Sequence, residues 1–439
     1  MIESPKAFIY DLDERPPFWR NIFYGIQCAV LMLSSMTIFS MLAGTALQLP
    51  LVARAALVQR VLLVSGLAMI AQFFMGHRYP MLGGPSIAVT LTIISLAPYG
   101  GDVVAGGMIA GGACLVAVYL FNLLRPLERL FTQNVTAVVI LLIAFSLLPS
   151  IAPKLAGVGS FQPEYRPLAL LLALGVLCVV CAFSLKAGGI WQSLSILIGM
   201  ATGYLVCFFW GIIDTASVRL APWFALPEIF PFGAPRFFLP AVLSFVFAYL
   251  VVLTNFMGSI YGMAETLGHQ DISRRLRHGI GITGAAGIAA GIFGAIGTVP
   301  KSTSPGLVLT TRIASHYAQL ACGFIITACA LVPKLGAVLA GIPDPVIGGA
   351  FLVVLASQVG LGIRTATRGR SVLSARDGFV VGLPLLLGTA IPLIPYHFFQ
   401  NLPILAAAFL RNGLTVGLLT VVILEHLVMK NEEKEQKKG

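Results

Sequence analysis

Apolar segments of roughly 20 residues follow one another along almost the whole chain, and short breaks between them hold most of its charged residues and many of its prolines and glycines. A helix of roughly 20 apolar residues is long enough to cross the hydrocarbon core of a bilayer. The pattern therefore predicts an all-α, polytopic membrane protein with about fourteen transmembrane segments. We expect them at residues 21–47, 52–75, 80–97, 103–123, 130–150, 167–185, 190–212, 237–262, 280–297, 299–312, 317–333, 345–361, 377–395 and 402–428.

An even number of segments places both chain ends on the same side of the membrane. We expect a 7+7 inverted repeat, with segments one to seven in residues 21–212 and segments eight to fourteen in residues 237–428. An external loop, residues 213–236, would join the repeats, and cytoplasmic tails would lie at 1–20 and 429–439.

The distribution of positive charge tests this topology. Nineteen Lys and Arg residues fall in the segments that would be cytoplasmic, against six in the opposite loops. The six are Arg54, Lys154, Arg166, Arg219, Arg236 and Lys334. Because excess Lys and Arg mark cytoplasmic loops, both termini are predicted to be cytoplasmic and the protein to lie in the cell inner (plasma) membrane.

Composition supports the same class. Hydrophobic residues make up 58% of the 439 residues and charged residues 10%, so there is too little polar surface to cover one soluble core. The first twenty residues lack the apolar run of a secretory signal, and the first apolar segment is therefore expected to remain as a span. The net charge of +11 follows from the cytoplasmic loops, and we expect no nucleic-acid partner.

Two of the predicted segments are interrupted. The third opens with GHRYPMLGGPSIAV (76–89) and the tenth with GTVPKSTSPGLVL (297–309), so Pro, Gly and Ser directly precede an apolar stretch in both. Such backbone survives at membrane depth only where it lines a cavity or is buried in protein. Because the two segments hold corresponding places in the two halves, they predict half-helices that form a substrate site. The alternative is that Pro and Gly are simply more frequent in membrane helices.

Four stretches resemble the signature regions of the nucleobase-ascorbate transporter family, the nucleobase-cation symporters that carry uracil, xanthine and urate. They are GHRYPMLGGPSIAV, NFMGSIYGMAETLGHQ, PGLVLTTRIASH and PKLGAVLAGIPDPVIGG. Gly306 with Thr311 and Arg312 matches the family's N-x-G-x(4)-T-R, and residues 342–349 are similar to its I-P-x-P-V-L-G-G. The resemblance implies a fourteen-span fold whose core and gate domains interleave across both repeats, a homodimer, and transport without an organic cofactor.

The resemblance also implies site residues in the first half of the chain. Ser86 and Ile87 fall in a run similar to the family's G-S-S-F-A-F, and Gln27 stands where its first span carries Gln-His.

In the second half, the family's substrate-binding glutamate has a second glutamate ten positions later. This register places Asn255 at the binding position and Glu265 at the later one. Thr303 and Ser304 replace the family's Gln/Glu-Asn pair. Glu265 is a candidate for ion coupling, with a proton or sodium ion, or else a surface partner of the arginines at 274–277.

A nucleobase presents a planar edge of N–H donors and C=O acceptors, so its site needs donors and acceptors rather than catalytic groups. The Asn255 amide offers both, and Thr303 and Ser304 offer hydroxyls. Backbone amides near Ser86 and Gly306, at the starts of the half-helices, can also donate to a carbonyl or an anionic ring.

Lys301 is a cation inside the interrupted tenth segment. A charge at the centre of a bilayer costs about 2.5–3.5 kcal/mol on insertion scales, so Lys301 is either functional or snorkels to a surface. Lys301 and the missing binding carboxylate favour a second function class, an anion transporter on the same fold.

The chain lacks the sequence patterns of other classes. Cys178 and Cys181 have CxxC spacing but lie in an apolar segment, so no disulfide or redox site is expected. Histidines are scattered, which predicts no metal site, and no Walker loop is present. We therefore predict a secondary transporter, rather than an enzyme, for a nucleobase-like planar heterocycle such as xanthine, urate or uracil.

Overall fold

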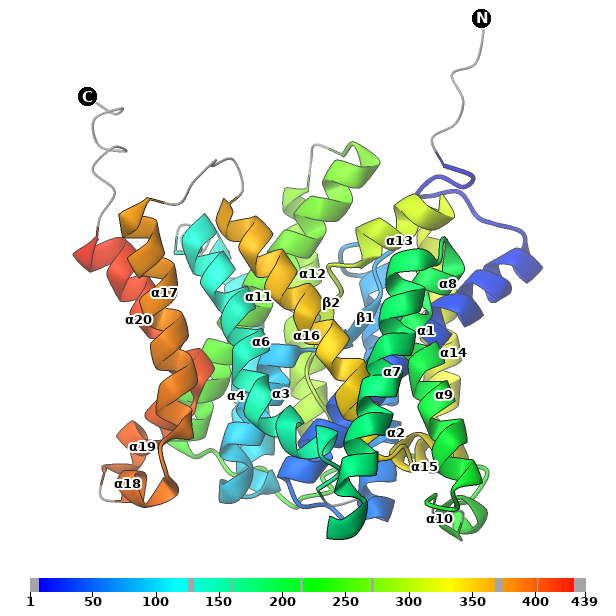
Figure 1. The fold of residues 1–439 in the computed structure, drawn as a ribbon. Coiled ribbons are helices and arrows are strands. Elements are labelled where there is room, and N and C mark those ends of the chain that lie inside the picture. Colours follow the sequence, from blue (N-terminus) through cyan, green and yellow to red (C-terminus); the bar gives the residue numbers. More distant parts are fainter. Residues whose placement is uncertain are drawn as a thin grey trace, which may run out of the picture.

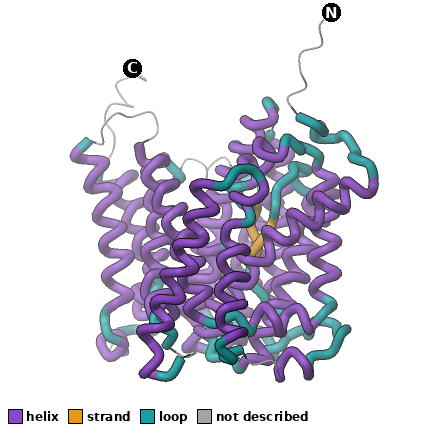
Figure 2. Tube along the Cα trace, turned by 45° about the vertical axis from the view of Figure 1, so that its right-hand side comes forward, coloured by secondary structure: helices purple, strands orange, loops and turns teal. Residues whose placement is uncertain are grey.

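The computed structural model describes residues 8–124, 130–158, 161–213, 216–269, 272–367, 374–400 and 402–429. These residues form a bundle of helices with one small pair of strands near its middle (Figures 1 and 2).

The first half contains α1 (Phe18–Ala46), α2 (Leu51–Phe74), β1 (Gly83–Pro85), α3 (Ile87–Leu96), α4 (Gly101–Leu120), α6 (Gln133–Leu155), α7 (Arg166–Lys186), α8 (Ile190–Ser193), α9 (Ser195–Phe209) and α10 (Ala216–Leu220). The second contains α11 (Leu239–Leu267), α12 (Ser273–Ile292), β2 (Thr298–Pro300), α13 (Ser304–Thr311), α14 (His316–Ala330), α15 (Pro333–Ala340), α16 (Asp344–Thr367), α17 (Ala375–Ala390), α18 (Tyr396–Gln400), α19 (Ile404–Arg411) and α20 (Gly413–Ile423). A π-helix, η4 (Leu424–Val428), continues α20, and short 3-10 turns η1 (Ala97–Tyr99), η2 (Pro163–Tyr165) and η3 (Ile391–Leu393) complete the described elements.

Within the described ranges, eight helices are long and apolar enough to cross a membrane, or nine if α14 and α15, which meet at a bend of 87°, form one span. The chain is thus a multi-pass membrane protein. The predicted spans outnumber these long helices because several are built from shorter pieces. The segment at 80–97 holds only β1 and α3, that at 299–312 only part of β2 and α13, and that at 190–212 the helices α8 and α9.

The helices pack as two groups. In the first group, α1, α2 and α14 pack together, as do α4, α11 and α12; in the second group, α6, α7, α16, α17 and α20 pack around one another. Glycines allow the closest approach within the first group. A Cβ on Gly112 of α4 would lie 2.6 Å from the backbone nitrogen of Ile288 in α12, so only a residue without a side chain fits there.

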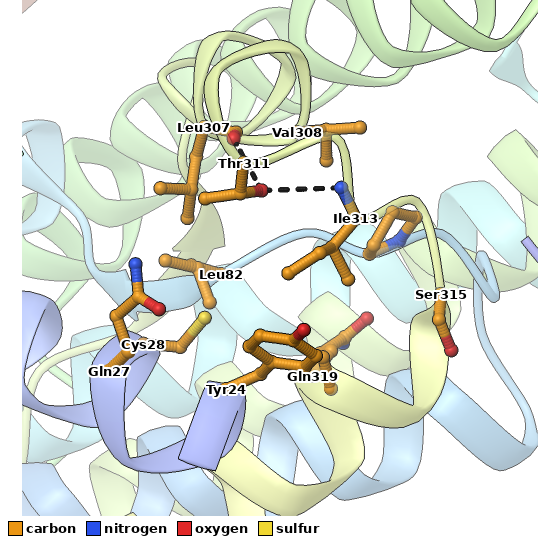
Figure 3. A pocket seen from close by; sticks show the side chains of 12 residues that line it. Tyr24, Gln27, Cys28, Leu82, Leu307, Val308, Thr311, Ile313, Ser315 and Gln319 are labelled. Atoms are coloured by element: carbon orange, nitrogen blue, oxygen red, sulfur yellow. Dashed lines mark hydrogen bonds between the residues drawn. The ribbon is translucent and has the colours of Figure 1, made fainter. Parts of the chain in front are cut away.

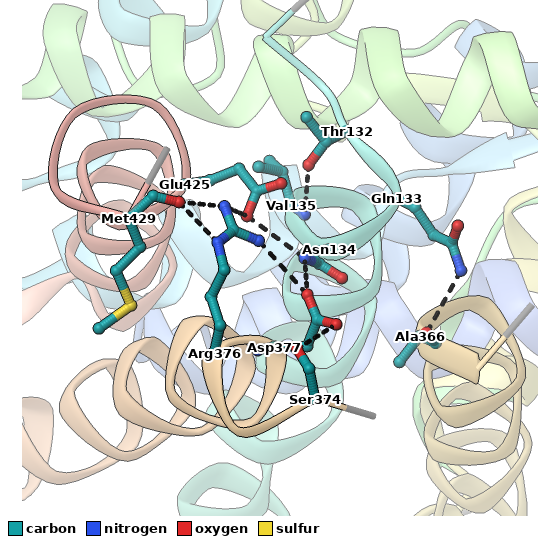
Figure 4. A network of polar contacts seen from close by, with 10 residues as sticks. All are labelled: Thr132, Gln133, Asn134, Val135, Ala366, Ser374, Arg376, Asp377, Glu425 and Met429. Atoms are coloured by element: carbon teal, nitrogen blue, oxygen red, sulfur yellow. Dashed lines mark hydrogen bonds and ion pairs between the residues drawn. The ribbon is translucent and has the colours of Figure 1, made fainter. Parts of the chain in front are cut away.

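A buried polar network closes one end of the second group (Figure 4). The Asn134 amide of α6 donates to Asp377 of α17 at 2.9 Å and to Glu425 of η4 at 3.2 Å. Arg376 lies 3.2 Å from Glu425 and 3.4 Å from Asp377. The two carboxylates are therefore compensated by donors of the same helix group.

The first and last described segments, blue and red in Figure 1, lie at the same end of the bundle, which we call the terminal end. The C-terminal ends of α1 and α6 and the start of α16 lie toward the opposite end.

Lys154 corrects the sequence-based topology in detail. It was expected in an external loop, but α6 continues through Pro149 and Pro153 and holds Lys154 in its last turn. There the side chain is 4% exposed and forms an ion pair with Asp344 at the start of α16. The ion pair explains why a charged residue after the apolar run is drawn into the bundle, since a buried charge needs a partner.

Candidate substrate site

The two interrupted segments, more than 200 residues apart in sequence, meet in the middle of the bundle (Figure 2). β1 and β2 pair antiparallel, with Gly83 opposite Pro300, Gly84 opposite Val299 and Pro85 opposite Thr298. Two further backbone bonds extend the pairing at 2.8 Å each, from Ser86 N–H to Gly297 O and from Lys301 N–H to Leu82 O. The non-helical backbone of each segment therefore satisfies the other's polar groups, as the absence of water in the bilayer core requires.

A short helix leaves each strand. α3 begins after Ser86, whose hydroxyl accepts a hydrogen bond from Val89 N–H and whose own N–H is bonded to Gly297 O. Both polar groups of Ser86 are therefore used in hydrogen bonds that hold the strand crossing and the start of α3. The backbone amides of Ile87 and Ala88, in the first turn of α3, have no acceptor within the helix. At α13, Ser304 N–H is bonded to Lys301 O at 3.1 Å, and Pro305, the next residue, has no N–H.

Thr303 and Ser304, predicted together as hydroxyl donors, point to different surroundings. Ser304 is 1% exposed, and its hydroxyl accepts a hydrogen bond from Leu82 N–H at 3.0 Å. Thr303 is exposed and makes no side-chain capping bond to α13. Ser304 thus holds the strand crossing together, whereas the Thr303 hydroxyl faces accessible space.

Asn255 lies on a face of α11 that continues toward α13. Asn255, Gly258, Gly262 and Glu265 are spaced by three or four residues and so share one side of the helix. Asn255 is half-buried, Gly258 is exposed, and a Cβ on Gly262 would lie 3.7 Å from Pro305 Cγ at the start of α13. Glu265 is exposed and lies about 15 Å farther along the helix axis than Asn255, at 1.5 Å per residue.

Lys301 turns back onto the strand crossing. Its ammonium group lies 3.3 Å from Pro85 O and 5.1 Å from the centre of the Phe39 ring, while its Cε would be 3.1 Å from a Cβ on Gly84. The side chain is therefore held between β1 and α1 by a carbonyl and an aromatic face.

Gln27 shares a pocket with Leu82, the residue directly before β1. It lines this pocket with Tyr24 and Cys28 of α1 and with Thr311 on another face of α13 (Figure 3). Sequence reasoning missed Tyr24, Ser315 and Gln319 as lining residues of this pocket. Only the spacing of Tyr24 from Gln27 and of Ser315 from Gln319, three and four residues, could have indicated them.

Among the described residues, no group of three His, Cys, Asp or Glu side chains could hold a metal ion. The site is thus a crossing of two strands with two helix starts, an amide, an exposed hydroxyl and an ammonium group. Such an arrangement can bind a small polar solute through donors and acceptors.

The chain belongs to the permease family, whose sequence pattern matches residues 20–396. This confirms the family expected from the signature stretches. It is 28% identical to the uric acid permease PucJ of Bacillus subtilis, covering 94% of this chain and 93% of that protein. It is 27% identical to the uric acid transporter UacT of Escherichia coli over 92% and 85% of the two chains, and 26% identical to the xanthine permease of B. subtilis over 93% and 94%.

Solved structures show the same fold. The transmembrane domain of the cyanobacterial bicarbonate transporter BicA superposes with a TM-score of 0.63 at 15% identity, covering 92% of this chain and 96% of that one. The murine anion transporter Slc26a9 in its inward-facing state gives 0.61 at 13% identity, over 93% and 68%.

Ser304→Ala tests the role of this hydroxyl in the scaffold. The change leaves the buried Leu82 N–H without its acceptor and should lower the free energy of unfolding by about 1–3 kcal/mol. Thermal unfolding of the purified protein in detergent measures the effect. Ser302→Ala, two residues earlier and exposed, is the control and should change little. Equal effects of the two changes would contradict the assignment.

Proposed function

We propose that this chain is a secondary active transporter of a nucleobase-like planar heterocycle such as xanthine, urate or uracil, working by alternating access. The observation that carries the proposal is the crossing of β1 and β2, which sets two helix starts beside the Asn255 face of α11 in a chain of the permease family. The named activities of the relatives PucJ, UacT and the B. subtilis xanthine permease support this substrate class.

In this proposal, Asn255 and Thr303 bind the polar edge of the heterocycle. The Asn255 amide both donates and accepts, and the Thr303 hydroxyl is exposed at the start of α13. Amides of Ile87 and Gly306 lie at the starts of the two short helices, where the positive end of each helix dipole favours an electronegative atom. Ser86 and Ser304 hold the strand crossing in place through their hydrogen bonds. Gln27 contacts the solute from the pocket that it lines with Tyr24 and Thr311.

The proposed architecture is the fourteen-span, 7+7 inverted repeat, in which the first helix group is the core domain and the second is the gate domain. Glu265 is the candidate for coupling to a proton or sodium ion, because Asn255 cannot take up a proton. By the family resemblance, the transporter is a homodimer in the plasma membrane, surrounded by lipid.

The orientation of the chain can be tested from its loops. The excess of Lys and Arg predicts that the loop after α16 is cytoplasmic and that the loop before η2 is external. Single cysteines at Thr367 and Gln162, both exposed, in a variant without the seven native cysteines should be labelled by a membrane-impermeant maleimide from opposite sides. Labelling of Thr367→Cys from outside intact cells would reverse the orientation.

Asn255→Ala tests the proposed substrate contact. Loss of a buried hydrogen-bond partner should weaken binding of xanthine or urate by about 1–3 kcal/mol, as measured by calorimetry on the purified protein. Glu265→Gln on the same helix face is the matched control and should affect affinity less. If Glu265→Gln abolishes binding while Asn255→Ala leaves it intact, the register that assigns Asn255 to the site is wrong.

A second candidate, an anion transporter on the same fold, is favoured by Lys301 at the strand crossing. With a cation and two helix starts near the site, an anionic solute such as urate would be preferred to neutral uracil.

Lys301→Gln tests whether the site prefers an anionic solute to a neutral one. It should weaken binding of urate by about tenfold or more and binding of uracil much less, because only the anion loses a Coulombic partner in a low-dielectric site. Competition binding with both ligands measures the difference. Equal effects on urate and uracil would leave Lys301 with a structural role and the neutral nucleobase as substrate.

A further inference from the structure

The two helix groups are joined by a polar contact away from the terminal end of the bundle. The ammonium group of Lys154 in α6 donates to the hydroxyl of Thr45 in α1 at 3.1 Å and forms the ion pair with Asp344 in α16. The Thr45 hydroxyl in turn donates to Met41 O within α1 at 2.7 Å. One lysine therefore links the first helix group to two helices of the second.

Several residues around the proposed site are exposed. Along the face of α11 that points toward α13, Gly258 and Glu265 are exposed, and a Cβ on Gly258 would meet no atom within 4 Å. Thr303 and Gly306 of α13 are exposed as well. The exposed residues thus lie along a helix that runs to the terminal end, whereas Lys154 and Thr45 join the two helix groups toward the opposite end.

The two charged residues of this contact lie in the same helix group, which makes the contact suited to repeated opening. Both charged groups, Lys154 and Asp344, belong to the second helix group, so separating α1 from that group leaves the ion pair intact. The hydrogen bond from Lys154 to the neutral Thr45 hydroxyl is then exchanged for water. Separating two buried charges would instead cost several kcal/mol.

We propose that Lys154 and Thr45 form a latch that holds the site closed at the end away from the chain termini, and that its release accompanies opening of the site to that side. The inference rests on the proposed alternating access, but it concerns side chains that are not among the proposed substrate-binding residues. It predicts that the hydroxyl of Thr45, rather than its bulk, sets the balance between the two open states.

Thr45→Val tests the latch, because it removes the hydroxyl and leaves the Lys154–Asp344 pair in place. Gly258→Cys in a variant without native cysteines serves as the reporter, and a membrane-impermeant maleimide is added to right-side-out or inside-out vesicles. With the latch intact, the reporter should react mainly from the side of the chain termini. Thr45→Val should shift the ratio of the two labelling rates about tenfold toward the opposite side, which corresponds to about 1.4 kcal/mol.

Thr37→Val is the matched control. Thr37 is a buried residue of the same helix, and its hydroxyl donates to Leu33 O at 2.8 Å, within α1. Thr45→Ser, which keeps the hydroxyl, should behave as the parent protein.

A shift with Thr45→Val, but not with Thr37→Val or Thr45→Ser, supports the latch. An unchanged ratio, or the same shift in both valine variants, would overturn it; if Thr45→Val does not fold, Thr45→Ala is read in the same way. Labelling requires no substrate, so its result does not depend on whether the protein transports a nucleobase. That proposal is tested separately, by measuring ligand binding to the Asn255→Ala variant.

Discussion

The pairing of β1 with β2 is the interaction on which the rest of the structure depends. Two helices start inside the bundle, each after a short non-helical strand whose backbone N–H and C=O groups need partners at membrane depth. The antiparallel register from Gly83 to Pro85, extended by the bonds of Ser86 and Lys301, lets each strand satisfy the other. This pairing allows two helices to begin in the middle of the bundle.

A second constraint governs how the two helix groups can move. Charged side chains are compensated inside the second group at both ends, by Lys154 with Asp344 at one end and by Asn134 and Arg376 with two carboxylates at the other. We call the boundary between the two groups the seam. It is bridged by the hydrogen bond of Lys154 to the Thr45 hydroxyl and by the edge-to-face contact of Phe39 with Phe351, whose ring centres lie 5.3 Å apart. Such apolar contacts and single hydrogen bonds can slide or separate without leaving a buried charge unpaired.

The sequence predicted what depends on local chemistry. Pro, Gly and Ser before apolar stretches located both short helices, and the signature stretches predicted the permease family. It could not separate the roles of Thr303 and Ser304, because adjacent hydroxyls differ only through Leu82, which is more than 200 residues away in the chain. Lys154 was placed in a loop because the apolar pattern fades near Pro149, whereas the ion pair with Asp344 extends the helix into the bundle.

The electrostatics of the crossing connect the site to the seam. The Lys301 ammonium lies against the Phe39 ring, and Phe39 packs on Phe351 of the second group, so a change of charge near Lys301 acts on a side chain at the boundary between the groups. With asparagine at position 255, the positive charge of Lys301 has no carboxylate at the corresponding place on α11; Glu265 is about 15 Å farther along the helix. An anionic solute at the crossing would supply the missing negative charge and would weaken the pull of Lys301 on the Phe39 ring. Lys301 and Phe39 thereby form a chain of contacts from the strand crossing to the second helix group.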